Sequence, residues 1–273
     1  MCQLKTTFTC KGSKLGVVMF RSVLFLLASL LATVTIAKSD LQSITYLTEE
    51  YPPYNFTENG ELHGIAVDLL VAATARARAT QPVAKEDISV QPWARAYRTV
   101  LINKDTVLFS TTRTKLRENL FNWVGPISAT RIVVMAKKSA QISIKRPNDL
   151  IQYRIGVIRD DVGEQLLLEL GVPRNSMQES SYAATLAEQL YKGRIDLWAY
   201  EENVAKWWIS KGGFNSEDFE PVYVLQEGEL YYAFNKDVDG ASVRALQQAI
   251  DALKHTSDDE NQTFYQSIVS KYR

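Results

Sequence analysis

Short apolar segments alternate with helix-like segments along the chain, and this alternation restricts the possible fold more than any other feature. The segments "TVLFS", "YRIGVI" and "RIDLWAY" have the length and composition of buried β-strands. The segments "PWARAYRTVLIN", "DDVGEQLLLELG" and "SSYAATLAEQLYKG" have a helical pattern, and Gly171 and Gly193 end the last two. The alternation predicts an α/β protein with sheets flanked by helices.

The ends of this region extend the same pattern. A strand "SITYLT" and a proline-containing loop precede a helix from about Ile65 to Ala79, and a further strand lies near residues 88–91. The chain closes with two amphipathic helices, whose apolar stripes are Val243, Leu246, Ile250 and Leu253, then Phe264, Ile268 and Tyr272. A chain of 273 residues lies where single cores begin to divide, so we expect two lobes. The strand-like "RIVVMAKK" predicts a hinge of extended chain between them.

The first 37 residues have the pattern of an export signal. Basic residues up to Arg21 precede an apolar run from Val23 to Ala37, which ends in small residues suited to cleavage. The run is shorter than the roughly 18 residues of a usual membrane span, so an uncleaved anchor is the weaker alternative. Met1 and Met19 both remain possible starts.

Cleavage after Ala37 would remove every cysteine, since Cys2 and Cys10 both precede it. The mature chain would then have no disulfide, thiol nucleophile or cysteine metal site. The segment carries four basic residues and no acidic ones, while the whole chain has a formal net charge of zero. The mature protein would therefore be net negative, which argues against nucleic acid or an anionic membrane surface as the partner.

Four stretches, "YPPYNFTENGELHGIAVDLL", "STTRTKLR" followed by "FNWVGPI", "YRIGVI" and "LYKGRIDLWAYEE", together resemble the family 3 periplasmic solute-binding proteins. These are the polar amino-acid receptors of ABC importers. The resemblance implies a monomeric periplasmic protein of the type II-like two-lobe fold, with two extended hinge crossings. It places a signal peptide at 1–37, lobe one at 38–134 plus 232–273, and lobe two at 135–231. It also implies capture of a small polar solute by hinge closure, for an ABC importer or a sensor.

The resemblance assigns the ligand's carboxylate to an arginine, which suits the role because a planar guanidinium pairs with a carboxylate through two hydrogen bonds. The matching residue is Arg117, with Ser110 and Thr112 as further contacts. Arg113 is the rival candidate within the same stretch. The alternative is that "RTKLRE" begins a solvated helix whose charges meet only water.

In the family an acidic residue just after the strand that contains Asp196 binds the ligand's ammonium group, and the resemblance assigns this role to Glu201. The alternative is that Glu201, at a strand end, is simply solvated. Tyr51 and Trp93 are the candidates for aromatic walls, because stacking buries apolar surface without demanding hydrogen bonds. The other reading of these aromatic residues is core packing.

One stretch departs from the family pattern. Where the family has a hydroxyl-rich turn, this chain has "RDDVGE", and carboxylates there would repel a ligand carboxylate. Asp160 and Asp161 either cap the following helix, or Asp161 faces a ligand with extra positive charge, or the ligand is not an α-amino acid.

An enzyme on this fold is the alternative function. Some members are periplasmic dehydratases acting on cyclohexadienyl acids, and a buried carboxylate could serve as their acid. The sequence has no Gly-x-Ser-x-Gly or His-Glu-x-x-His motif, and its two histidines, His63 and His255, lie far apart. We therefore expect a binding protein without a catalytic site, metal or cofactor.

Overall fold

The protein's structure, a computed structural model, describes residues 1–4, 6–7, 9, 41–77, 82–257 and 261–272. The predicted export signal, with its apolar run from Val23 to Ala37, falls almost wholly outside these residues and stays a prediction. The chain divides into the units Met1–Ala37 and Lys38–Arg273, and the second holds all the elements below. Among the described residues, no helix combines the length and apolar character that crossing a bilayer requires.

The strands form one continuous eight-stranded sheet and a separate hairpin. In chain order they are β1 (Thr45–Thr48), β2 (Phe56–Glu58), β3 (Glu61–His63), β4 (Ile88–Val90), β5 (Thr106–Thr112), β6 (Phe121–Lys137), β7 (Ile155–Ile158), β8 (Met177–Ser180), β9 (Leu197–Glu201) and β10 (Phe219–Asn235). The order in the sheet is β4, β1, β5, β10, β6, β9, β7, β8, and β2 pairs with β3. At one end β1 is parallel to β4 and β5, and at the other β7 is parallel to β8 and β9.

Two long strands connect the parallel ends. β6 and β10 pair antiparallel along their length, β10 also pairs with β5, and β6 also pairs with β9. The two lobes are therefore joined by two extended crossings, and the predicted two-lobe α/β fold is confirmed. The sheet is continuous rather than divided between the lobes, because both crossing strands run through without a break. The lobe limits 38–134 with 232–273, and 135–231, stay a prediction.

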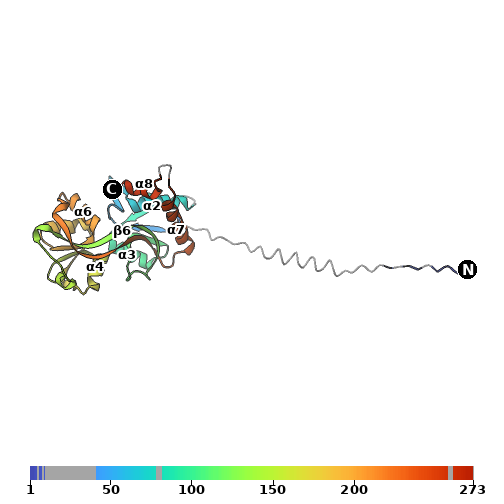
Figure 1. Cartoon of the computed structure of the whole chain (residues 1–273), viewed down its shortest axis with the longest axis horizontal. Coiled ribbons are helices and arrows are strands. Elements are labelled where there is room, and N and C mark those ends of the chain that lie inside the picture. The colour runs from blue at the N-terminus through green and yellow to red at the C-terminus, as the bar shows by residue number, and fades with distance from the viewer. Residues whose placement is uncertain (5, 8, 10–40, 78–81, 258–260, 273) are drawn as a thin grey trace. The chain divides into compact units, whose positions relative to one another are not determined.

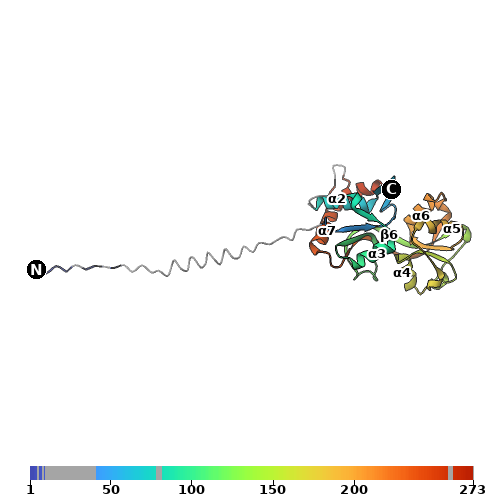
Figure 2. The same ribbon diagram turned by 180° about the vertical axis from the view of Figure 1, so that it is seen from behind.

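Helices cover the two ends of the sheet separately. Figures 1 and 2 place α4, α5 and α6 around the β7–β9 end, and α2, α3, α7 and α8 around the β1–β5 end. The closing helices pack against α2, and the Tyr272 hydroxyl donates to Asp68 Oδ2 at 2.9 Å. The α-helices are α2 (Ile65–Arg76), α3 (Trp93–Ile102), α4 (Val162–Glu169), α5 (Ala183–Tyr191), α6 (Glu202–Lys211), α7 (Gly240–His255) and α8 (Phe264–Ser270). Single 3-10 turns lie at Lys85–Asp87, Lys138–Ala140, Pro147–Leu150, Arg174–Ser176 and Ser216–Asp218.

Two local expectations differ from the structure. Helix α6 is not predicted, although its buried positions, Val204, Ala205 and Ile209, lie on one face of the helix. The stretch after Thr114 forms turns and not the first turn of a solvated helix, and Arg117 within it is buried.

Gly64 fixes how the first loop meets helix α2. Its φ is 125°, and a Cβ there would lie 2.3 Å from the carbonyl oxygen of Tyr54. The loop and helix can approach this closely only because residue 64 has no side chain.

We expect Gly64→Ala to lower the free energy of unfolding by more than about 2 kcal/mol, because strain in the backbone adds to the clash. Gly60→Ala is the matched control: its φ is also positive, at 84°, but a Cβ there meets nothing within 4 Å. The control should lose only about 1 kcal/mol in denaturant titrations. Equal losses in the two variants would contradict the role given to the close approach.

Candidate functional site

Residues that follow the parallel strands of one lobe contact those that follow the strands of the other. The Trp93 Nε1 group, after β4, donates to the Asp160 carbonyl oxygen, after β7, at 2.9 Å. The Tyr54 hydroxyl, after β1, donates to Glu201 Oε1, at the end of β9, at 3.4 Å. Ligands of open α/β sheets bind outside the carboxyl ends of the strands. The facing strand ends therefore form the candidate site.

Arg117 lies in this contact with one donor group unused. Its residue is 1% exposed, its Nε donates to Gln165 Oε1 at 2.9 Å, and its Nη1 donates to the Thr112 carbonyl oxygen at 3.4 Å. The guanidinium carbon lies 5.1 Å and 5.0 Å from the ring centres of Trp93 and Tyr97. Its Nη2 is buried and has no hydrogen-bond partner among the described residues. A buried guanidinium with an unused amino group is suited to receive an anionic oxygen.

Arg113, the rival, has its charge paired elsewhere. Its Nε and Nη2 donate to the Glu118 carboxylate at 2.8 Å and 2.5 Å. Its guanidinium also lies against the rings of Trp123 and Tyr231, and its side chain is 39% exposed. Arg113 therefore fits a surface ion pair better than a ligand contact.

Asp161 is buried at the start of helix α4, where the charge of Arg117 acts on its carboxyl. It stands at the N-cap position of α4, yet its side chain makes no cap hydrogen bond. It is 4% exposed, and its Oδ2 has no partner among the described residues. Burial raises the pKa of the Asp161 carboxyl, and the positive charge of Arg117 opposes that rise. The backbone amides of Val162 and Gly163, at the start of α4, also oppose the rise, so capping stays an alternative for one carboxylate oxygen, while Oδ2 adds a second unsatisfied group to the site among the described residues.

The neighbours of Asp161 hold this turn in place. Asp160 has a φ of 60°, and its carbonyl oxygen accepts from the Gln165 Nε2 group at 3.0 Å as well as from Trp93. Gly163 lets α4 approach β9, since a Cβ there would lie 2.6 Å from the Ala199 carbonyl oxygen. Gln165 thus links the turn to Arg117 across the lobes.

Glu201 is buried but already has partners. Its Oε2 accepts from the Val204 amide at 2.7 Å as the N-cap of α6, and its Oε1 accepts from Tyr54 and from Asn203 Nδ2. Burial raises the pKa of Glu201 to about 7. Its contact with a ligand ammonium stays a prediction. Both of its carboxylate oxygens already accept hydrogen bonds, whereas Asp161 Oδ2 has no partner among the described residues.

The predicted aromatic and hydroxyl residues lie at the same strand ends. Tyr51 and Trp93 are 3% and 2% exposed, so both are buried at the lobe contact. Ser110 has a φ of 58° and its hydroxyl donates to Asn55 Oδ1, while Thr112 offers its carbonyl oxygen to Arg117. The structure thus brings Tyr51, Trp93, Thr112, Arg117 and Asp161 together, with Ser110 and Glu201 beside them.

Three further residues belong to this cluster and were missed from the sequence: Glu49, Gln165 and Tyr200. Tyr200 packs edge-on against Tyr51, with ring centres 5.6 Å apart, and its hydroxyl is buried without a partner among the described residues. Burial and the negative charge of Asp161 raise the pKa of Glu49, while Arg117 opposes the rise. Glu49 directly follows β1, a strand-end position that could have marked it. Gln165 and Tyr200 carry no signal that distinguishes them from ordinary helix and strand residues.

The profile of the bacterial extracellular solute-binding proteins, family 3, matches residues 44–267. The chain belongs to this family, and a solute-binding role follows. No curated protein matches the sequence. Within the described residues, no group of three or more histidine, cysteine, aspartate or glutamate side chains is placed to hold a metal ion.

Solved structures show the same fold. A histidine kinase sensor domain with similarity to periplasmic binding proteins has a TM-score of 0.70 and 18% identity, over 84% of this chain and 95% of that one. A mutant of ArgBP from T. maritima has a TM-score of 0.69 and 18% identity, over 85% and 95%. An ancestral arginine-binding protein bound to arginine has a TM-score of 0.66 and 21% identity, over 85% and 99%.

The raised pKa of Glu201 has a consequence for stability. Between its ordinary 4.5 and about 7, the folded protein holds a proton that the unfolded chain has lost. Burial of this carboxyl therefore costs stability as pH rises through that range. Glu201→Gln removes the titration and keeps an oxygen for the Val204 amide.

We expect the free energy of unfolding of Glu201→Gln, relative to the parent, to increase by about 1 to 3 kcal/mol between about pH 4 and pH 8. Urea titrations of the unliganded proteins at several pH values measure this difference. Glu188→Gln, at an exposed carboxylate paired with Lys192, is the control and should show no such increase. A difference for Glu201→Gln that does not change with pH would contradict the assignment.

Proposed function

We propose that the protein binds a small polar, amino-acid-like solute between its lobes, and that closure of the lobes around the solute is the functional event. The proposal rests on two of the buried atoms that have no partner among the described residues, Arg117 Nη2 on one lobe and Asp161 Oδ2 on the other. A free amino acid presents a carboxylate and an ammonium group, which are the partners these two atoms lack.

The contacts between the lobes support closure as the response to ligand. Trp93 and Arg117 donate to Asp160 and Gln165 across the lobes, but these few bonds leave buried groups without partners. A ligand that satisfies groups on both lobes binds the closed form better than the open one and so shifts the population towards it.

The proposed setting is the periplasm, reached through the export signal. Receptors of this kind serve either an importer or a sensor, and proteins similar to this chain include a substrate binding protein of an amino acid ABC transporter and a histidine kinase sensor domain. An amino acid as ligand also agrees with the ancestral arginine-binding protein, which has been solved with arginine and with glutamine. We propose delivery of the solute to an ABC importer, with sensing as the alternative.

A second function, a cleft enzyme such as a cyclohexadienyl-type dehydratase, is favoured by one observation. Asp161 is a buried carboxyl with a raised pKa and a free oxygen, which could donate a proton. Incubation with candidate acids followed by mass spectrometry separates the two functions. Unaltered recovery of every bound compound removes the support for the enzyme.

We expect Arg117→Ala to weaken binding roughly 10- to 150-fold, since a hydrogen bond to a charged group contributes about 1.5 to 3 kcal/mol. A thermal-shift panel of the common amino acids first identifies a ligand, and calorimetry then measures its dissociation constant. Arg117→Lys tests the same point with the charge kept and the planar fork lost. Melting curves of both variants show whether they remain folded.

Arg113→Ala is the matched control, because it removes a guanidinium from the same stretch whose charge is already paired with Glu118. Its affinity should stay within about twofold of the parent, as expected for an exposed pair. A folded Arg117→Ala that binds as tightly as the parent would falsify the proposed role of Arg117.

A further inference from the structure

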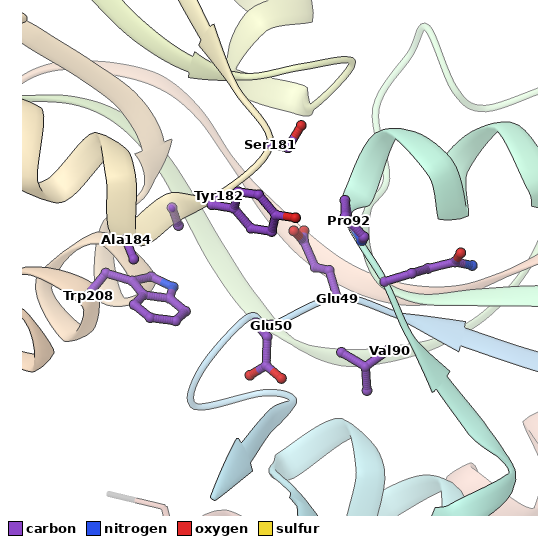
Figure 3. A pocket seen from close by; sticks show the side chains of 10 residues that line it. Glu49, Glu50, Val90, Pro92, Ser181, Tyr182, Ala184 and Trp208 are labelled. Carbon is purple, nitrogen blue, oxygen red and sulfur yellow. The ribbon is translucent and has the colours of Figure 1, made fainter.

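A pocket opens beside the buried cluster, with walls from both lobes. Its volume is about 230 Å³, and Figure 3 shows Glu49, Glu50 and Val90 on one side, facing Tyr182 and Trp208 on the other. Tyr182 directly precedes α5 and Trp208 lies in α6, so closure of the lobes forms the pocket. The pocket thus adds space for a part of the ligand beyond its carboxylate and ammonium.

Glu49 lines this pocket and is mostly buried. The residue is 8% exposed, and among the described residues no hydrogen bond or ion pair engages its carboxylate. Its backbone oxygen accepts from Asn55 Nδ2 at 2.6 Å. The adjacent Glu50 differs, because its carboxylate accepts from the amide and hydroxyl of Thr57 at 2.9 Å and 2.6 Å.

Burial and the negative charge of Asp161 raise the pKa of Glu49 and so favour its uncharged form when no cation lies beside it. Asp161 adds a second negative charge nearby, and Arg117 is the positive charge that acts on both. If Arg117 takes a ligand carboxylate and Asp161 a ligand ammonium, Glu49 still lacks a counter-charge. An unpaired buried charge is costly unless it is neutralised or paired.

Apolar and aromatic side chains form much of the remaining wall, together with the polar residues Gln91 and Ser181. Val90 and Pro92 line one side, and the ring of Tyr182 and the indole of Trp208 line the other. Such walls suit an alkyl chain, and aromatic faces also attract a cation. A short apolar arm ending in a positive charge would match both the walls and Glu49.

We propose that this pocket receives a positively charged side chain of the ligand, a guanidinium or an ammonium on an alkyl arm, which pairs with Glu49. The inference rests on the proposed function of the same site, and it names the substrate class as a cationic amino acid.

The test compares ligands matched in shape but not in charge. Calorimetry measures arginine against citrulline, and lysine against 2-aminoheptanoic acid, whose terminal methyl group replaces the ammonium, with the parent protein and with Glu49→Gln. The cationic member of each pair should bind the parent at least tenfold more tightly. In Glu49→Gln this preference should fall below about threefold, since a charge-assisted bond is roughly twice as strong as a neutral one.

Glu49→Gln replaces a mostly buried carboxyl whose ionised form is costly, so the melting temperature of the variant should equal or exceed that of the parent. Glu58→Gln, at an exposed position of the β2–β3 hairpin, is the control for loss of one acidic charge and should keep the full preference. This control separates a local pairing at Glu49 from the general field of the protein.

Two outcomes overturn the inference alone. Neutral members that bind the parent as tightly as the cationic ones, or a preference that survives in Glu49→Gln, would show that Glu49 does not select charge, while Arg117-dependent binding would leave the proposed function intact. Failure of every amino acid in the panel to bind would overturn the proposed function as well.

Discussion

A guanidinium buried between two lobes must have its charge satisfied, and much of the candidate site is arranged around this need. The side chain of Arg117 is held by the Gln165 amide, the Thr112 carbonyl and the faces of Trp93 and Tyr97. These contacts fix its position, but they leave Nη2 without a partner among the described residues. Desolvation of a charged donor is repaid only by a strong acceptor, so the site is most stable with an anionic group in place.

The fold brings the groups that complete the site from distant parts of the chain. β6 and β10 hold the two parallel ends of the sheet together, and the strand ends of each lobe then meet across the contact. Gly163 allows α4 to lie against β9, which places Asp161 in the buried cluster. Because the unsatisfied groups belong to both lobes, one ligand can satisfy them all only when the lobes are closed.

The fold could be predicted from the sequence in most of its parts, because buried strands and amphipathic helices have a period that local composition reveals. Helix α6 is not predicted, although its few buried positions share one face of the helix. Strand β6 extends well beyond the predicted "RIVVMAKK", because it is only partly buried along its length. The candidate site is predicted less completely than the fold.

Arg117 follows from a resemblance to the family. The partners of Arg113 and the surroundings of the Asp161 carboxylate depend on side-chain geometry that no local sequence pattern contains. Gln165 belongs to the site only through tertiary contacts, whereas Glu49 stands at a strand end, a signal that could have marked it.

The most direct test of this account is a crystal structure of the protein with its bound solute. The account predicts one molecule between the lobes, with its carboxylate on Arg117 Nη2 and a positively charged group within hydrogen-bond distance of Asp161 Oδ2 or the Glu49 carboxylate. A solute bound elsewhere, or bound between the lobes with Arg117 Nη2 still unpartnered, would contradict it.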